Sequence, residues 1–343
     1  MDRAIHFLTG YEFMRNKYQF WPNALVIIYV FLAYTIGVLL ISSALPWFNV
    51  VGVILLSHGL VISAYLQHEC FHYSVFRCRR YNTGLSIFLS WINGACYARL
   101  DDVRRMHLKH HVSKADTVHF DYREYLDNHA NIRRLVIYLE WAYIPAVEFV
   151  AHLYVILLPF VASTHREFRM RTLRVFAVRL SCFLLLAWVS WTALLYYAIS
   201  YCIFLTILRM VDAFQHTFDV IPLARGARDR ATNIKDKEYE MENTYSNLVS
   251  VRYPLLNLLT LNFVYHTAHH LNPSIPWHQL SSYHASSSCQ VKNQVIPMRA
   301  LLSNYHKHRV RRIMDEESGE VNLAAKQIDG FIGAIGVSFL TDV

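Results

Sequence analysis

The sequence predicts an all-α integral membrane protein in which four transmembrane helices form two hairpins, with interfacial helices and a histidine-rich cap. Of its 343 residues, 54% are hydrophobic. Three long runs, at residues 23–45, 47–66 and 175–210, carry almost no charge, and each reaches about the 20 residues that a spanning helix needs. Histidines gather in the polar segments that follow these runs. The runs predict the spans, and the histidines predict a site at their ends.

The first two runs follow a short polar and aromatic leader, residues 1–22, and are separated at Pro46. Two helices joined there form a hairpin, which returns the chain to its starting side just before His68. Arg77, Arg79 and Arg80 come next, and clustered positive charge predicts that this side is cytoplasmic. We expect a cytoplasmic leader at 1–22, a membrane domain at 23–285 and a cytoplasmic tail at 286–343.

Two apolar segments between the runs are harder to assign. Residues 81–100 are interrupted by Gly84, Asn93 and Gly94, which favours an interfacial or re-entrant helix. Residues 135–162 contain acidic residues and prolines, which also favours the interface.

The third run of 36 residues would be ~54 Å long as one helix, against a hydrocarbon core of ~30 Å, so two crossings fit better. In the rival interpretation, 135–162 spans the membrane and 175–210 is a single helix. Both interpretations place the histidine-bearing segments on one side.

The net charge of +8 comes from Lys and Arg clusters between and beyond the apolar runs. This distribution favours cytoplasmic retention and contact with anionic lipid over nucleic-acid binding. The six cysteines form no C-x-x-C pair, so we expect free thiols. No glycosylation sequon is present, which favours loops in a reducing compartment.

Nine of the nineteen histidines follow a spacing that metal chemistry explains. Residues three or four apart lie on neighbouring positions of one helix face, so their imidazoles can reach one ion. The first group is a pair four residues apart, the second and third repeat H-x-x-H-H, and a ninth histidine follows the last run: His68 and His72; His107, His110 and His111; His266, His269 and His270; and His216. Asp212 and Asn262 each precede a candidate ligand by four residues, so they are candidates to orient a ligand or hold a metal-bound water.

Eight imidazoles in three groups are too many for one closed zinc site, which takes about four ligands, and they suit two ions. Imidazole with open coordination positions suits iron that reduces dioxygen, although zinc and copper also accept nitrogen ligands. A non-enzymatic alternative is a metal transporter. Transporters place polar ligands at mid-membrane depth, whereas these groups are expected at helix ends.

The histidine groups resemble those of the membrane fatty acid desaturase family. The resemblance covers about residues 23–285 and rests on H-E-C at 68–70, H-x-x-H-H at 107–111, Q-H-T at 215–217, and H-x-x-H-H at 266–270 followed by Leu271, Pro273 and Pro276. It implies a mushroom-like bundle of four membrane helices under a cytoplasmic cap that holds two iron ions, with molecular oxygen as co-substrate. The implied metal ligands are His68, His72, His107, His110, His111, His216, His266, His269 and His270.

The resemblance implies an oxidoreductase of lipid metabolism that desaturates a membrane-embedded acyl chain. The alternative within the family is a hydroxylase or ketolase acting on a fatty, carotenoid or hydrocarbon chain. No haem-binding His-Pro-Gly-Gly motif and no ferredoxin-type cysteine pattern is present. We therefore expect a separate electron donor, either ferredoxin or cytochrome b5 with its reductase. Among membranes, we favour the bacterial inner membrane over the endoplasmic reticulum.

Overall fold

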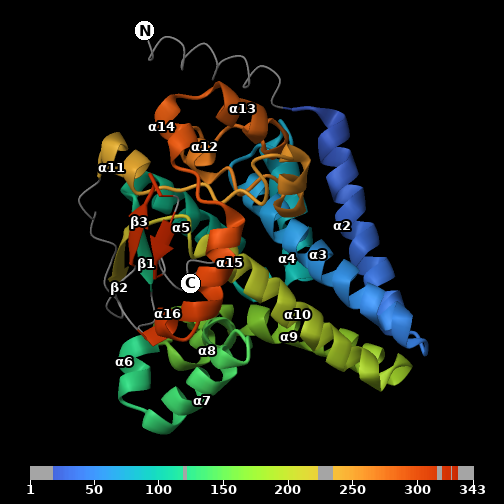
Figure 1. Cartoon of the computed structure of the whole chain (residues 1–343). Helices are drawn as coiled ribbons and strands as arrows, with labels where there is room; N and C mark the ends of the chain where they lie inside the picture. The colour runs from blue at the N-terminus through green and yellow to red at the C-terminus, as the bar shows by residue number, and fades with distance from the viewer. Residues whose placement is uncertain (1–17, 119–121, 223–234, 315–318, 326, 331–343) are drawn as a thin grey trace.

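The structure, a computed structural model, describes residues 18–118, 122–222, 235–314, 319–325 and 327–330. Helices dominate these residues, and four of them are long and apolar enough to cross a membrane. They are α2 (Phe20–Ile41), α3 (Pro46–Phe71), α9 (Arg169–Val189) and α10 (Trp191–Asp212). In Figure 1 they extend to the right and lower right, away from the short elements of the cap. The predicted helical fold with four candidate spans is confirmed, whereas the arrangement of the spans in two hairpins and the cytoplasmic position of the cap stay predictions.

The third apolar run contains two helices, as predicted, and the break between them falls at Ser190. The backbone of Ser190 is extended, with φ −156° and ψ 111°, and its carbonyl accepts a hydrogen bond from the Ala193 amide as α10 begins. A short 3-10 helix, η2 (Ser163–Phe168), leads into α9. The rival interpretation of one long helix across 175–210 is wrong.

The two segments of uncertain assignment are also helical, but neither forms a helix long enough to count as a span. Residues 135–162 fall into α7 (Ala130–Trp141) and α8 (Ala146–Val161). Residues 81–100 form most of α4 (Arg79–Asn93), followed by η1 (Ala95–Tyr97). Gly94 joins this pair with φ +89°, and a Cβ there would lie 2.5 Å from the Tyr201 hydroxyl oxygen. Only glycine fits both the backbone angle and the close contact.

Short elements make up the cap and the connections to it. They are α5 (Leu100–Ser113), β1 (Ala115–Val118), α6 (Tyr122–Asp127), β2 (Asp219–Pro222), α11 (Lys237–Glu242), η3 (Pro254–Thr260), α12 (His266–Leu271), η4 (Trp277–Gln279), α13 (Leu280–Ser286), α14 (Cys289–Asn293), α15 (Met298–His308), α16 (Arg311–Met314), β3 (Glu320–Asn322) and β4 (Gln327–Asp329). β1 and β2 pair in parallel, with Ala115 opposite Asp219. Because β1 follows α5 and β2 follows His216, this pairing brings the histidines of α5 close to the end of α10. β3 and β4 form a separate antiparallel pair.

Close helix packing joins α2 to α3 along their length. A Cβ added at Gly52 of α3 would lie 2.7 Å from the Ile41 backbone nitrogen, and one added at Gly37 of α2 would lie 2.9 Å from the Leu56 Cβ. Small residues at such crossings let backbones approach closely, which is how helices gain contact area inside a membrane.

A buried network of charges ties α10 to the helices beside the cap. Arg209 of α10 forms ion pairs with Glu140 of α7 and Glu148 of α8, and Arg312 of α16 lies 3.6 Å from Glu148. All four side chains are at least nine-tenths buried. Such charges are tolerated only when each carboxylate keeps a cationic partner, so the network fixes the relative positions of these helices.

The predicted free thiols are confirmed for the cysteines whose side chains are described, namely Cys70, Cys78, Cys96, Cys182 and Cys202. The side chain of Cys289 lies outside the described residues.

Candidate metal centre

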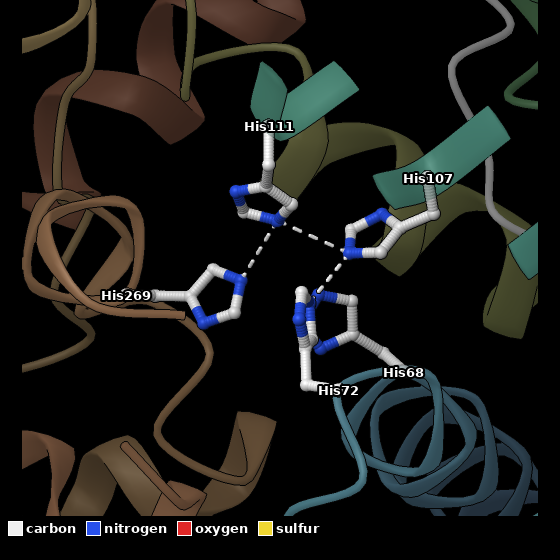
Figure 2. A group of neighbouring side chains, drawn as sticks. All are labelled: His68, His72, His107, His111 and His269. Atoms are coloured by element: carbon white, nitrogen blue, oxygen red, sulfur yellow. Dashed lines mark hydrogen bonds between the residues drawn. The ribbon is translucent and has the colours of Figure 1, made fainter. Parts of the chain in front are cut away.

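Five predicted ligands from three helices form the first histidine group (Figure 2). His68 lies in the last turn of α3 and His72 caps that helix, so they share one face. His107 and His111 come from α5, and His269 comes from α12. One nitrogen from each imidazole lies within 4.8 Å of the others. Nε2 of His107 is 2.7 Å from that of His72 and 3.2 Å from that of His111.

The other four predicted ligands form a second group beside the first. One nitrogen from each of His110, His216 and His270 lies within 4.8 Å of the others. The Nε2 atom of His216 is 3.2 Å from that of His110 and 2.7 Å from that of His266. The structure thus brings all nine predicted ligands into two adjacent groups, although their binding of metal stays a proposal.

The protonation state of these imidazoles suits metal binding, because a ligand must present a lone pair. Burial lowers the pKa well below its usual value for five of the histidines outside the membrane helices, and neighbouring histidines lower it further. These are His107, His111, His216, His266 and His270. The same causes lower the pKa of His269 to about 3. Neutral imidazoles are therefore expected at neutral pH.

One imidazole nitrogen, Nε2 of His270, tests whether these residues fit a metal ion. His270 Nδ1 lies 3.0 Å from Oε1 of Glu240, so the neutral ring donates its N–H there and leaves a lone pair on Nε2. That Nε2 is buried and has no hydrogen-bond partner among the described residues. Such an atom costs free energy unless something binds it. Because it belongs to the second group, a bound cation would satisfy it, and the residues fit a metal.

Aromatic rings pack against both groups of histidines. The Phe263 ring lies 4.8 Å from the His68 ring and 5.0 Å from the His266 ring, centre to centre, and the Tyr65 ring stacks on Phe263 at 4.5 Å. On the second group, Phe218 stacks on His216 at 4.1 Å. A dry surrounding strengthens electrostatic interactions inside the site.

Two carboxylates outside the set of predicted site residues contact the histidines. Glu240 of α11 contacts His270 as described, and it also lies within reach of His111. Glu69 lies 3.7 Å from His68 Nδ1, and it accepts hydrogen bonds from Ser74 Oγ and the Trp277 amide. The position of Glu69 between His68 and His72 in the sequence was a usable signal. Glu240 had none, since no periodic pattern connects it with a histidine.

The predicted roles of Asp212 and Asn262 rested on a helix face shared with a ligand, and neither face exists. α10 ends at Asp212, and His216 forms an isolated bridge with Thr244 beyond that end. Asn262 sits in a turn with φ +60° before α12 begins, and its amide donates to the Trp277 carbonyl at 3.0 Å. The shared-face argument is wrong, while a role for either side chain toward a metal-bound water stays a prediction.

Comparison with known proteins assigns most of the chain. A family model described as fatty acid desaturase matches residues 44–301, from the start of α3 to within α15. No curated protein matches the chain. The match includes all nine histidines of the two groups, whereas the predicted domain limits of 23 and 285 stay predictions.

Proposed function

Since the chain belongs to the fatty acid desaturase family, and is therefore a membrane oxidoreductase of a non-haem iron family, we propose that it desaturates a membrane-embedded acyl chain. Nine histidines carry the proposal, because they form two adjacent groups with one nitrogen per ring turned inward. A single ion cannot use nine ligands, since ions that accept imidazole take about four to six.

We propose two iron ions. His68, His72, His107, His111 and His269 would hold one, and His110, His216, His266 and His270 the other. When bound, such a pair supplies an oxygen-dependent oxidant strong enough to take hydrogen from an unactivated methylene group.

The overall reaction balances with dioxygen and an outside electron source. The acyl –CH2–CH2– unit loses two hydrogen atoms and becomes –CH=CH–. Dioxygen takes up those two hydrogens together with two electrons and two protons, and leaves as two molecules of water. We propose that the electrons come from a separate donor, ferredoxin or cytochrome b5 with its reductase.

The protein residues orient the metal ligands and exclude water from the site. Glu240 accepts a hydrogen bond from His270, and Glu69 lies beside His68, so these carboxylates orient ligand rings as carboxylates beside metal-binding histidines do. Phe263 and Phe218 cover the rings, so water is excluded from the place where the acyl chain must react. The substrate's own position then decides which methylene lies nearest the metals.

Depth along the helices argues against metal transport. His68 lies in the last turn of α3, and His216 follows the end of α10, whereas a transporter binds its ion near the middle of the membrane. We propose that these helix ends face the cytoplasm, with the bacterial inner membrane as the favoured location.

Iron and product analysis on one set of samples tests the proposal. The full chain is expressed, its iron per protein is measured after purification, and cellular fatty acids are profiled by mass spectrometry. A His269→Ala variant removes a proposed ligand. The matched control is His284→Ala, which removes another largely buried histidine, one that contacts the Tyr265 ring outside both groups.

We expect about two irons and new unsaturated chains with the native protein and the control, and loss of both with His269→Ala. If iron is bound but the products are hydroxylated or oxidised chains, the reaction is that of a hydroxylase or ketolase and the proposed desaturation is wrong. A purified, folded protein that binds no iron would refute the di-iron centre itself.

A further inference from the structure

A cavity of about 350 Å³ lies beside the membrane helices, outside the two histidine groups. Residues of η1, α8, α9 and α10 line it, together with Gly94. Its wall is almost wholly apolar or aromatic, and none of the nine histidines belongs to it. The volume falls within the usual range of small-molecule sites, about 300–1,000 Å³.

Among the described residues that line this cavity, Arg179, in the middle of the membrane helix α9, is the only one with a formal charge. Its guanidinium packs over the Phe183 ring at 5.1 Å, and one nitrogen donates to the Trp91 carbonyl at 2.8 Å. Its Nε is buried and has no hydrogen-bond partner among the described residues, none of which places a carboxylate within salt-bridge distance of it. A guanidinium has five N–H donors, so this cation has capacity for an anion.

A second arginine on the same helix shows what a purely structural role looks like. Arg171, two turns earlier, donates to the carbonyls of Cys96, Tyr97 and Ala98 at 2.7–2.9 Å and so secures η1. Arg179 makes one such bond. Charged residues within membrane helices are costly and usually serve a function when they lack a partner.

The polar groups beside Arg179 add no negative charge. His152 Nδ1 lies 2.8 Å from the Glu148 carbonyl, and its Nε2 lies 3.1 Å from the Tyr201 hydroxyl. Burial, with the nearby Arg179 charge, lowers the pKa of His152 to about 4, so this ring is neutral at pH 7. The cavity therefore presents a single uncompensated positive charge within apolar walls.

We propose that this cavity binds the acidic headgroup of a membrane lipid, a carboxylate or a phosphate, and that Arg179 is the residue that binds it. The planar guanidinium matches both groups, because each can accept two parallel hydrogen bonds. Two of the lining helices, α9 and α10, are candidate spans, and the rim residues Phe149 and Ala198 are exposed. An amphiphile can therefore reach the cavity from the bilayer, and the apolar walls accept the carbons next to its headgroup. The site does not depend on the proposed reaction.

Lipid binding to the purified full-length protein in phosphatidylcholine nanodiscs tests the proposal. The probes are oleic acid, phosphatidylglycerol and, as the uncharged comparison, oleyl alcohol, each followed by native mass spectrometry. Arg179→Gln removes the charge from the cavity. Arg174→Gln is the matched control, because it removes a charge from an exposed position of the same helix. Ala198→Phe fills the rim and leaves the bond between Arg179 and Trp91 in place.

We expect the native protein and Arg174→Gln to bind an acidic probe in preference to oleyl alcohol. Arg179→Gln should weaken that binding about ten- to hundredfold, as expected for loss of a charged hydrogen-bonding partner, and Ala198→Phe should also weaken it. The stronger acidic probe identifies the headgroup as carboxylate or phosphate. Equal binding of acidic and uncharged probes would overturn the proposal, as would native-like binding by Ala198→Phe, which remains informative if Arg179→Gln does not fold.

Discussion

Removing the Glu240 carboxylate should weaken iron binding through His270, although Glu240 belongs to neither group of proposed ligands. Its Oε1 accepts a hydrogen bond from the His270 Nδ1–H at 3.0 Å, and the side chain is about 94% buried. A hydrogen bond to a charged group contributes about 1.5–3 kcal/mol. Loss of a carboxylate that is hydrogen-bonded to a metal-binding histidine costs about 10–100-fold in metal affinity, or about 1.4–2.8 kcal/mol. The two ranges agree, so Glu240→Ala should weaken binding about 10–100-fold.

Competition with a chelator measures this effect directly. Iron-loaded protein is equilibrated with increasing chelator, and the iron that remains bound is determined for the native protein, Glu240→Ala and Glu240→Gln. Glutamine keeps an oxygen acceptor without the charge, so the loss of iron affinity in Glu240→Gln should be smaller than in Glu240→Ala. Glu242→Ala is the control, because that exposed residue lies on the same short helix. If Glu240→Ala holds iron as tightly as Glu242→Ala, the argument that this carboxylate orients His270 is refuted.

Three further substitutions test the packing of the fold through the thermal unfolding midpoint of the purified protein. Arg209→Met leaves the buried Glu140 carboxylate without its ion-pair partner, so we expect a loss of about 3–5 kcal/mol; an unchanged midpoint would show that the pair is not structural. Gly52→Ala drives a Cβ against the Ile41 backbone nitrogen and should cost about 1–3 kcal/mol. Gly84→Ala meets no atom within 4 Å in helix α4 and should raise stability by about 0.4–1 kcal/mol; a loss there would refute the reasoning from open space.

The membrane helices could be predicted because their signal is local, yet their ends were less certain. Hydropathy ends the second span near residue 66, whereas α3 continues through Phe71. Its last turn carries His68 and Glu69, which are polar and buried, and Glu69 accepts hydrogen bonds from Ser74 and the Trp277 amide. Helical hydrogen bonding therefore continues past the point where the apolar signal stops.

Features set by contacts between distant segments could not be predicted. The run at 175–210 looked almost uncharged, although it contains Arg179 and Arg209. Glu140 and Glu148, the partners of Arg209, lie more than 60 residues away. Glu240 contacts His270 across 30 residues that include the 3-10 helix η3. In each case the tertiary fold, and no periodic pattern, brings the groups together.

The spacing H-x-x-H-H divides its histidines between the two groups, and helix geometry explains how. Successive residues turn by about 100°, so positions i and i+4 lie about 40° apart, whereas i+3 lies about 100° from i+4. In α5, His107 and His111 are the i and i+4 pair, and both point into the first group. His110, at i+3, points into the second.

The same spacing in α12 is used in the opposite sense. His266 and His270, the pair at i and i+4, lie in the second group, and His269 at i+3 lies in the first. Two helices that each give a pair to one group and a single histidine to the other must both lie between the groups. A spacing of H-x-x-x-H alone, as in α3, can serve one group only. The adjacent pair of histidines at i+3 and i+4 thus allows a short helix to contribute to both groups, and its occurrence in two segments is the sequence feature on which the proposal of two ions rests.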